Sequence, residues 1–141
     1  MAKIFDAKKY KEVEVFYSDI DKNMTKNYNS DLSLTINNGD VAQALSSLVL
    51  TPLGSVPFRP DFGTDIDTIL FEKMGLLQAD RIRSRILTAV QSYEPRVNIN
   101  SVEVQPDYNG YIYNVYIYYS VIYDETQSFK IFIPIQSYSN E

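Results

Sequence analysis

The chain has no cysteine and no histidine among its 141 residues. Without cysteine it forms no disulfide, which is typical of proteins that are assembled in a reducing cytoplasm. Without both residue types it lacks serine–histidine–aspartate and cysteine–histidine nucleophiles, and also the commonest zinc ligands. Most familiar hydrolase mechanisms are therefore excluded, and what remains is carboxylate chemistry, lysine chemistry or no chemistry.

Long apolar runs and a basic stripe are also lacking. No run approaches the roughly 20 residues of a membrane-spanning helix, and the start of the chain has no secretory apolar core, so no membrane partner is expected. The net charge is −5, and after position 96 the single lysine Lys130 stands against five acidic residues. Unspecific nucleic-acid binding depends on neutralising phosphates, so the sequence predicts no nucleic-acid partner.

The hydrophobic periodicity predicts an α+β fold and a single domain over residues 1–141. Residues 1–36 show no clean period and are expected to form an irregular N-terminal arm. Residues 37–95 form a helical part, with two to three helices marked by apolar residues at steps of three and four. Residues 96–137 alternate with a period of two and predict a three-stranded antiparallel meander, with helices on one face and two edges.

The segment between the first two helices is too rich in proline for a helix and too irregular for a strand. Phe58 and Phe62 of this loop are expected to plug the core, because large aromatic side chains dominate burial. In the longest helix, Arg81 and Arg85 are four residues apart and share one face. Pro95 ends that helix.

The strand region carries its own turn signals. A slip of face near residues 100–101 predicts a β-bulge. Residues 106–110 predict a hairpin turn, because Asn-Gly tolerates the positive φ that such turns require. A strand over residues 111–123 follows, and the polar residues 124–127 are expected to turn the chain again before the third strand.

Aromatic and branched side chains occupy both faces of the central strand. This pattern fits either the polar-tipped aromatic surface of a monomer or a contact surface, because tyrosine is enriched at interfaces. A free sheet edge can also accept a strand from another chain. The candidate partner-binding residues on the sheet surface or edge are Tyr116, Tyr118, Phe129, Ile131 and Ile133.

No catalytic residue, cofactor or metal site is predicted. Glycoside hydrolysis needs two carboxyl groups roughly 5–9.5 Å apart. Asp80 and Glu94 lie at opposite ends of one predicted helix, about 20 Å apart, and no pairing with Glu72 suggests itself. The acidic pairs around positions 19–21 and 65–67 also lack the loop pattern of calcium sites.

Five ordered motifs, taken together, resemble the baseplate wedge, or sheath-initiator, family of contractile phage tails and its type VI secretion counterparts. The motifs cover most of the chain and are YSDID at 17–21, PFRPDFG at 57–63, LFEKM at 70–74, QSYEPR at 91–96 and SVI at 120–122. The family has at times carried a lysozyme-like label. The resemblance implies a structural, non-enzymatic protein of the virion tail baseplate, assembled in the host cytoplasm.

The resemblance also implies a docking role for Glu94, Pro95 and Arg96. Taken alone, Glu94 and Arg96 could form a simple surface pair beside a helix stop, which contributes less than about 1 kcal/mol. In the family this signature is associated with docking on the core bundle of the other wedge subunits. The sheet would then act as the first template for the sheath protein, with several copies placed around the tail tube.

A different class of function remains open from the residues alone. A cytoplasmic adaptor domain that binds an unrelated partner by strand addition would have the same sheet. Such an adaptor would have no need for Glu94 and Arg96, so their removal separates the two hypotheses.

Overall fold

The computed structural model describes residues 2–6, 11–15, 17–26, 34–122 and 124–138. The chain divides into two compact units, Met1–Ala44 and Leu45–Glu141, and the boundary falls inside the first helix. The single domain expected over residues 1–141 stays a prediction.

The first unit contains two antiparallel strand pairs and the start of helix α1 (Asn38–Leu50). Strand β1 (Ala2–Asp6) pairs with β2 (Lys11–Val15), and β3 (Ser18–Ile20) pairs with β4 (Leu34–Ile36). The Gln43 side chain in α1 donates to the carbonyl of Ile20 and accepts from the amide of Lys22, both at 2.8 Å. The prediction of an irregular arm is therefore wrong over these strands, which are too short to show a clear period. Residues 27–33 of that arm lie outside the described residues.

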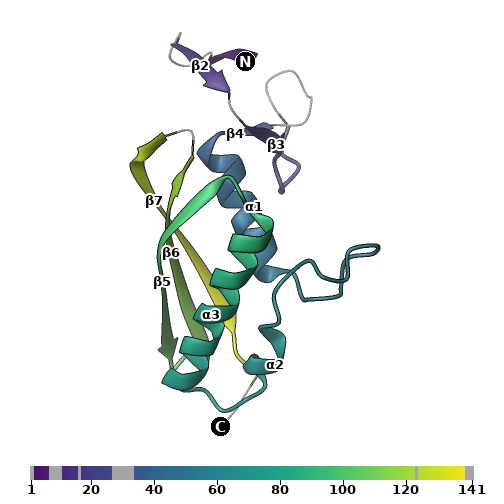
Figure 1. Ribbon diagram of the computed structural model, residues 1–141, viewed down its shortest axis with the longest axis vertical. Helices are drawn as coiled ribbons and strands as arrows, with labels where there is room; N and C mark the ends of the chain where they lie inside the picture. Colours follow the sequence, from purple (N-terminus) through teal and green to yellow (C-terminus); the bar gives the residue numbers. More distant parts are fainter. Residues whose placement is uncertain (1, 7–10, 16, 27–33, 123, 139–141) are drawn as a thin grey trace. The chain divides into compact units, whose positions relative to one another are not determined.

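The second unit is a helical layer on a sheet, as the α+β prediction requires. Helices α2 (Asp67–Leu70) and α3 (Leu76–Tyr93) precede strands β5 (Val97–Asp107), β6 (Ile112–Val121) and β7 (Asp124–Gln136). The strands form an antiparallel sheet in the order β5-β6-β7, so the predicted meander is confirmed. Helix α3 runs along one face of this sheet and packs on β5 (Figure 1).

The core of this unit lies between α3 and the inner face of the sheet. Residues of α3 at steps of three and four are buried, namely Ala79, Ile82, Ile86, Ala89 and Val90. Alternate residues of the central strand are buried as well, namely Tyr113, Val115, Ile117, Tyr119 and Val121. Burial of each large apolar side chain contributes about 1.5–3 kcal/mol. This core fixes β6 as the central strand, and within the described residues β5 and β7 each pair on one side only.

The first hairpin confirms one prediction and corrects another. The register shifts between Ile99 and Ser101, so the predicted bulge is confirmed. The positive φ of the turn lies at Tyr111 (53°), whereas Asn-Gly was expected to supply it. The carboxylate of Asp107 accepts from the amides of Asn109 (3.0 Å) and Gly110 (3.4 Å), and this Asx-type turn places the left-handed residue one position later.

The second hairpin is tighter than its composition suggested. Strand β7 already begins at Asp124, which pairs with Val121, so the turn predicted over residues 124–127 is wrong. Ser120 pairs with Ser128, and the extra residues of β7 between these two pairs form an irregularity in the ladder. The polar residues 124–127 thus belong to strand β7. Tyr123, which was predicted to end the central strand, lies outside the described residues.

Candidate docking corner and sheet surface

The end of α3 and the start of β5 form a helix–strand corner, made of Glu94, Pro95 and Arg96. Glu94 is the C-terminal cap of α3, and its amide donates to the carbonyl of Val90 at 2.9 Å. Pro95 follows directly and cannot continue the helix, because the residue before a proline avoids the helical region. The chain therefore changes direction at this corner, and the two charged side chains flank the proline.

Glu94 and Arg96 form a bidentate ion pair. The Nε and Nη2 atoms of Arg96 donate to the two carboxylate oxygens of Glu94, each at 2.7 Å. The Glu94 side chain is only 8% exposed, whereas that of Arg96 is 27% exposed. Fork-to-fork pairs of this kind are geometrically specific and stronger than single hydrogen bonds. Most of the Glu94 carboxylate is thus used within the chain, and Arg96 is the more accessible member of the pair.

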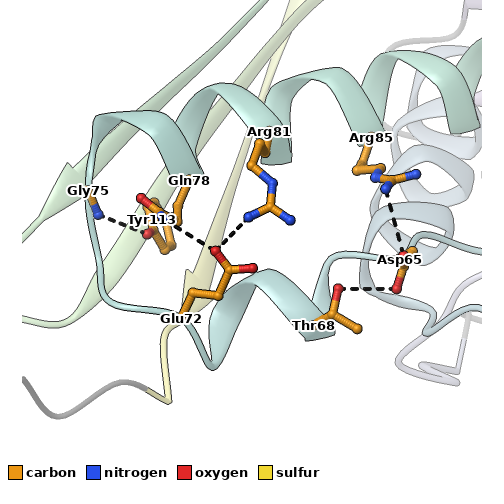
Figure 2. A network of polar contacts seen from close by, with 8 residues as sticks. All are labelled: Asp65, Thr68, Glu72, Gly75, Gln78, Arg81, Arg85 and Tyr113. Carbon is orange, nitrogen blue, oxygen red and sulfur yellow. Dashed lines mark hydrogen bonds and ion pairs between the residues drawn. The ribbon is translucent and has the colours of Figure 1, made fainter.

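A second polar cluster joins the start of α3 to its surroundings (Figure 2). Arg81 donates to Glu72 at 2.5 Å, and Gln78 donates to the same oxygen at 3.3 Å. These hydrogen bonds, that from Arg81 above all, lower the pKa of Glu72. Arg85, on the same face of α3 as predicted, lies 3.9 Å from the carboxylate of Asp65. The arginines of this helix face are therefore held by acidic groups of the chain itself.

The same cluster reaches the central strand. The amide of Gly75 donates to the hydroxyl of Tyr113 at 3.4 Å, and Gly75 is the N-terminal cap of α3. Burial raises the pKa of the Tyr113 hydroxyl. One side chain of β6 therefore ties the centre of the sheet to the start of the helix above it.

The proline-rich loop does not plug the core as expected. Phe58 is fully exposed, and Phe62 is only half-buried. The Phe62 ring meets Tyr93 edge-on, with ring centres 5.3 Å apart, and Arg59 lies 5.0 Å from the centre of the Phe62 ring. The core between α3 and the sheet is already filled by side chains of these elements, so the loop packs on the end of α3 instead.

The outer face of the sheet carries an aromatic cluster on the side opposite the core. Tyr116 and Phe132 stack with ring centres 5.1 Å apart, and the Nζ atom of Lys130 lies 4.4 Å from the Tyr116 ring and 5.4 Å from the Tyr118 ring. Phe132 is half-exposed. We call these four residues the aromatic face.

The predicted sheet residues are divided between the two faces. Tyr116 and Tyr118 lie on the aromatic face, whereas Ile133 is buried on the inner face and Phe129 contacts the buried ring of Tyr119. The predicted set therefore does not form one surface. The sequence reasoning missed Lys130 and Phe132, because the register that pairs them with Tyr118 and Tyr116 depends on the second hairpin, whose turn was predicted at the wrong residues.

Strands β5 and β7 are the edges of the sheet. In β7 the amide of Ser137, just beyond the strand, donates toward the β6 side, to the carbonyl of Tyr111 at 2.8 Å. Backbone N–H groups alternate along a strand, so those of Lys130 and Phe132 point away from β6. The backbone nitrogen of Pro134 also points away from β6. Proline has no N–H group, and at this position its absence does not cost a hydrogen bond to β6. The regular outward edge of β7 therefore runs from Ser128 to Ile133.

The carboxylates near α3 are paired with arginines or lie far from one another. In the described ranges no three histidine, cysteine or acidic residues come together to hold a metal ion. Glu94 and Glu72 are each bound to an arginine, and α3 separates Asp80 from Glu94 by about 20 Å. A helix with the length and apolar character needed to cross a membrane does not occur in the described part of the chain.

Comparisons with known proteins agree with this architecture. The family model for baseplate wedge protein gp25 matches residues 37–125. Baseplate wedge protein gp25 of Enterobacteria phage T4 is 39% identical over 110 residues, which are 78% of this chain and 83% of the relative.

Two solved structures share the fold. A putative tail lysozyme from Geobacter sulfurreducens has a TM-score of 0.67 at 21% identity, covering 77% of this chain and all of the other. A chain of the anti-feeding prophage baseplate has a TM-score of 0.60 at 18% identity, covering 89% of both chains. The matched sequence runs from the start of α1 through the helix–strand corner into the sheet, and the chain belongs to the gp25 family of baseplate wedge proteins.

Proposed function

We propose that this baseplate wedge protein is a non-enzymatic structural subunit that recruits the sheath protein of a contractile tail by strand pairing. The observation that carries the proposal is the sheet of the second unit, in which β5 and β7 each pair on one side only within the described residues. Helix α3 stiffens this sheet from behind. A preformed sheet edge supplies main-chain donors and acceptors to an incoming strand without any change of its own conformation.

The edge of β7 is the better-defined template. Its run from Ser128 to Ile133 has a regular register, and the outward amides of Lys130 and Phe132 are available to define the register of a partner strand. The opposite edge is interrupted by the bulge after Ile99. Bulges hinder edge-to-edge pairing. Lys130 and Phe132 of the aromatic face lie on the same strand and would contact the flank of the added strand.

The helix–strand corner would dock the protein on the core bundle of the other wedge subunits. The pair of Glu94 and Arg96 is already formed, so a partner meets a rigid, nearly neutral unit and not two mobile charges. Arg96 is the member that a partner can reach, because Glu94 is almost fully buried. The corner lies at the start of β5, and β7 is the outer strand at the opposite edge of the sheet. Docking at the corner would therefore leave the edge of β7 for the sheath.

An enzymatic role is disfavoured on chemical grounds. A glycosidase needs a general acid whose pKa is raised above its ordinary value. The pKa of Glu72 is lowered by Arg81, and Glu94 is bound by both prongs of Arg96. The name of the Geobacter relative is therefore not carried over to this chain.

The expected setting follows from the family. We propose several copies per baseplate, placed around the tail tube of a phage virion, and assembly in the host cytoplasm. The expected partners are other wedge subunits and the sheath protein; nucleic acid, membranes and cofactors are not expected to take part. All of residues 1–141 would act together as one wedge domain.

Electron microscopy of tails assembled with and without this chain tests the proposal. Sheath and tube proteins are present in both samples. We expect tubes without sheath, or sheath that polymerises away from the baseplate, when the chain is absent. Normal sheathed tails in its absence would remove the initiator role and leave a strand-binding adaptor as the better explanation.

A double variant tests the corner separately. Glu94→Gln with Arg96→Met removes both charges at once, so no buried carboxylate is left without its partner. We expect this variant to fold and to fail to enter baseplates. The matched control is Glu72→Gln with Arg81→Met, which deletes another short ion pair of the same unit. Equal incorporation of both double variants would refute docking through the corner.

A further inference from the structure

The loop between α1 and α2 presents a phenylalanine to solvent. Phe58 has a relative exposure of 102%, the highest among the exposed large apolar residues of the described chain, and its φ is +65°. A left-handed backbone is strained for a residue other than glycine, and such strain persists only where surrounding structure imposes it. An exposed aromatic in an imposed conformation is a feature that folding alone does not explain.

Hydrogen bonds hold both ends of this loop. Leu53 donates to the carbonyl of Thr64 at 3.0 Å, and Thr64 donates back to that of Thr51 at 2.9 Å. Nearer the tip, Arg59 donates to Val56 at 3.2 Å and Phe62 donates to Arg59 at 3.1 Å. Prolines at positions 57 and 60 restrict the backbone further. Figure 1 shows the loop extending away from α2 and α3. The tip is therefore presented in one conformation.

A third tie connects the loop to the helix–strand corner. The hydroxyl of Tyr93 donates to the carbonyl of Asp61 at 2.5 Å, and the Tyr93 and Phe62 rings are in contact. Tyr93 directly precedes Glu94 in the chain. The returning limb of the loop is thus fastened to the residue beside the corner. A partner that binds the corner is placed where it can also meet the loop.

We propose that Phe58 is an anchor that enters an apolar pocket on the same wedge subunit that receives the helix–strand corner. This inference rests on the proposed docking function and adds a second contact to it. The neighbouring Arg59 carries a positive charge at the tip, so the pocket is expected to have carboxylates at its rim. Rigid aromatic anchors in desolvated pockets dominate interface energetics, and a preordered loop loses little entropy on binding.

A second copy of this chain is the competing occupant. The second unit has a cavity of about 170 Å³, and its lining includes Leu50, Ile66, Leu70 and Ile135 together with Asp67. An apolar cavity of about 150 Å³ is large enough to bind benzene, so a phenyl ring would fit. The continuity of the loop with the corner favours the wedge subunit, and the experiment must separate the two.

Photo-crosslinking in assembled tails identifies the occupant. A benzoylphenylalanine replaces Phe58 in the full chain, and the crosslinked peptides are identified by mass spectrometry. We expect crosslinks to a baseplate subunit other than this chain. Crosslinks confined to a second copy, or none at all, would overturn the proposal. The same group at Phe132 is the control, since it lies on the aromatic face and should give a different set of crosslinks.

Incorporation measurements separate this proposal from the corner. Purified Phe58→Ala protein is added to tails that lack the chain, and bound protein is quantified. We expect at least about a tenfold loss of incorporation, as for interface anchors in general, with an unchanged melting temperature because Phe58 is fully exposed. Phe71→Ala, at another exposed phenylalanine, is the matched control. Normal incorporation of Phe58→Ala would refute the anchor even if the double variant at Glu94 and Arg96 fails. The reverse result would refute only the corner.

Discussion

At the scale of single residues, the Glu94 carboxylate depends most on one partner. It is 8% exposed and is bound by both prongs of Arg96. Arg96→Met leaves this buried charge without compensation, and we expect it to destabilise the protein by about 3 kcal/mol. Urea unfolding at neutral pH measures the change. Adding Glu94→Gln to Arg96→Met should recover part of the lost stability, because it removes the unpaired charge. A double variant that is less stable than Arg96→Met would show that this charge is not the cause of the loss.

Glu72 gives a prediction with a defined pH dependence. Arg81 lowers its pKa in the folded protein below the ordinary value of 4.5. The stability that this supplies is present above pH 4.5 and is lost as the pH falls through the lower, folded value. We therefore expect the difference in stability between the parent and Glu72→Gln to shrink as the pH falls below 4.5 and through the folded pKa.

Carboxyl titration by NMR checks the cause of the Glu72 shift. Arg81→Met should return the pKa of Glu72 toward its ordinary value. Arg83→Met is the control, because Arg83 lies near Asp80 on another side of α3. A Glu72 pKa that stays low without Arg81 would assign the shift to another group.

At the scale of elements, Gly63 decides whether the proline-rich loop can close. Its φ is +112°, and an added Cβ would lie 2.5 Å from the carbonyl oxygen of Thr51. Gly63→Ala should destabilise the protein by about 2 kcal/mol or more, because neither the backbone conformation nor the space admits a side chain. Gly110→Ala is the comparison, since its φ is not positive and its nearest contact is the end of the Asp107 side chain. Thermal melting of the two variants ranks them, and equal losses would refute this account of the loop.

Proline substitutions at two adjacent positions of β7 test whether its outward edge is the template for the sheath. Lys130→Pro removes an outward amide, so we expect a loss of stability below about 1 kcal/mol and a failure to nucleate sheath. Ile131→Pro removes an amide that faces β6 and should cost about 3 kcal/mol. Lys130→Ala controls for the side chain. Sheath assembly that proceeds on Lys130→Pro particles would show that this edge is not the template.

Elements with long, regular patterns could be predicted from the sequence. Helix α3 and the three strands of the sheet lie where periods of 3.6 and 2 place them, and even the bulge after Ile99 left a visible slip of face. The turn at 124–127 failed because polar composition resembles a turn, whereas pairing with Val121 depends on the neighbouring strand. Short strands before position 37 gave too few repeats for a pattern.

The candidate site was only partly predictable. The ion pair of Glu94 and Arg96 could be anticipated from their spacing, but the burial of Glu94 could not, because it depends on tertiary packing. Phe58 was misplaced for a related reason. Hydrophobicity predicts burial on average. The core between α3 and the sheet was already filled, so this residue remained outside.

For the molecule as a whole, the connection between α2 and α3 bears on tolerance to both acid and alkali. Glu72 and Gly75 both lie in this connection; Glu72 accepts from Arg81, and the amide of Gly75 donates to the Tyr113 hydroxyl (Figure 2). Burial raises the pKa of Tyr113, so its contribution to stability is present below the ordinary pKa of 10.0 and is lost as the pH rises through the folded value. Protons gained at Glu72 and protons lost at Tyr113 therefore loosen the same few residues. Acid, by protonating Glu72, and alkali, by deprotonating Tyr113, would thus act on one place, where the helix meets the middle of the sheet.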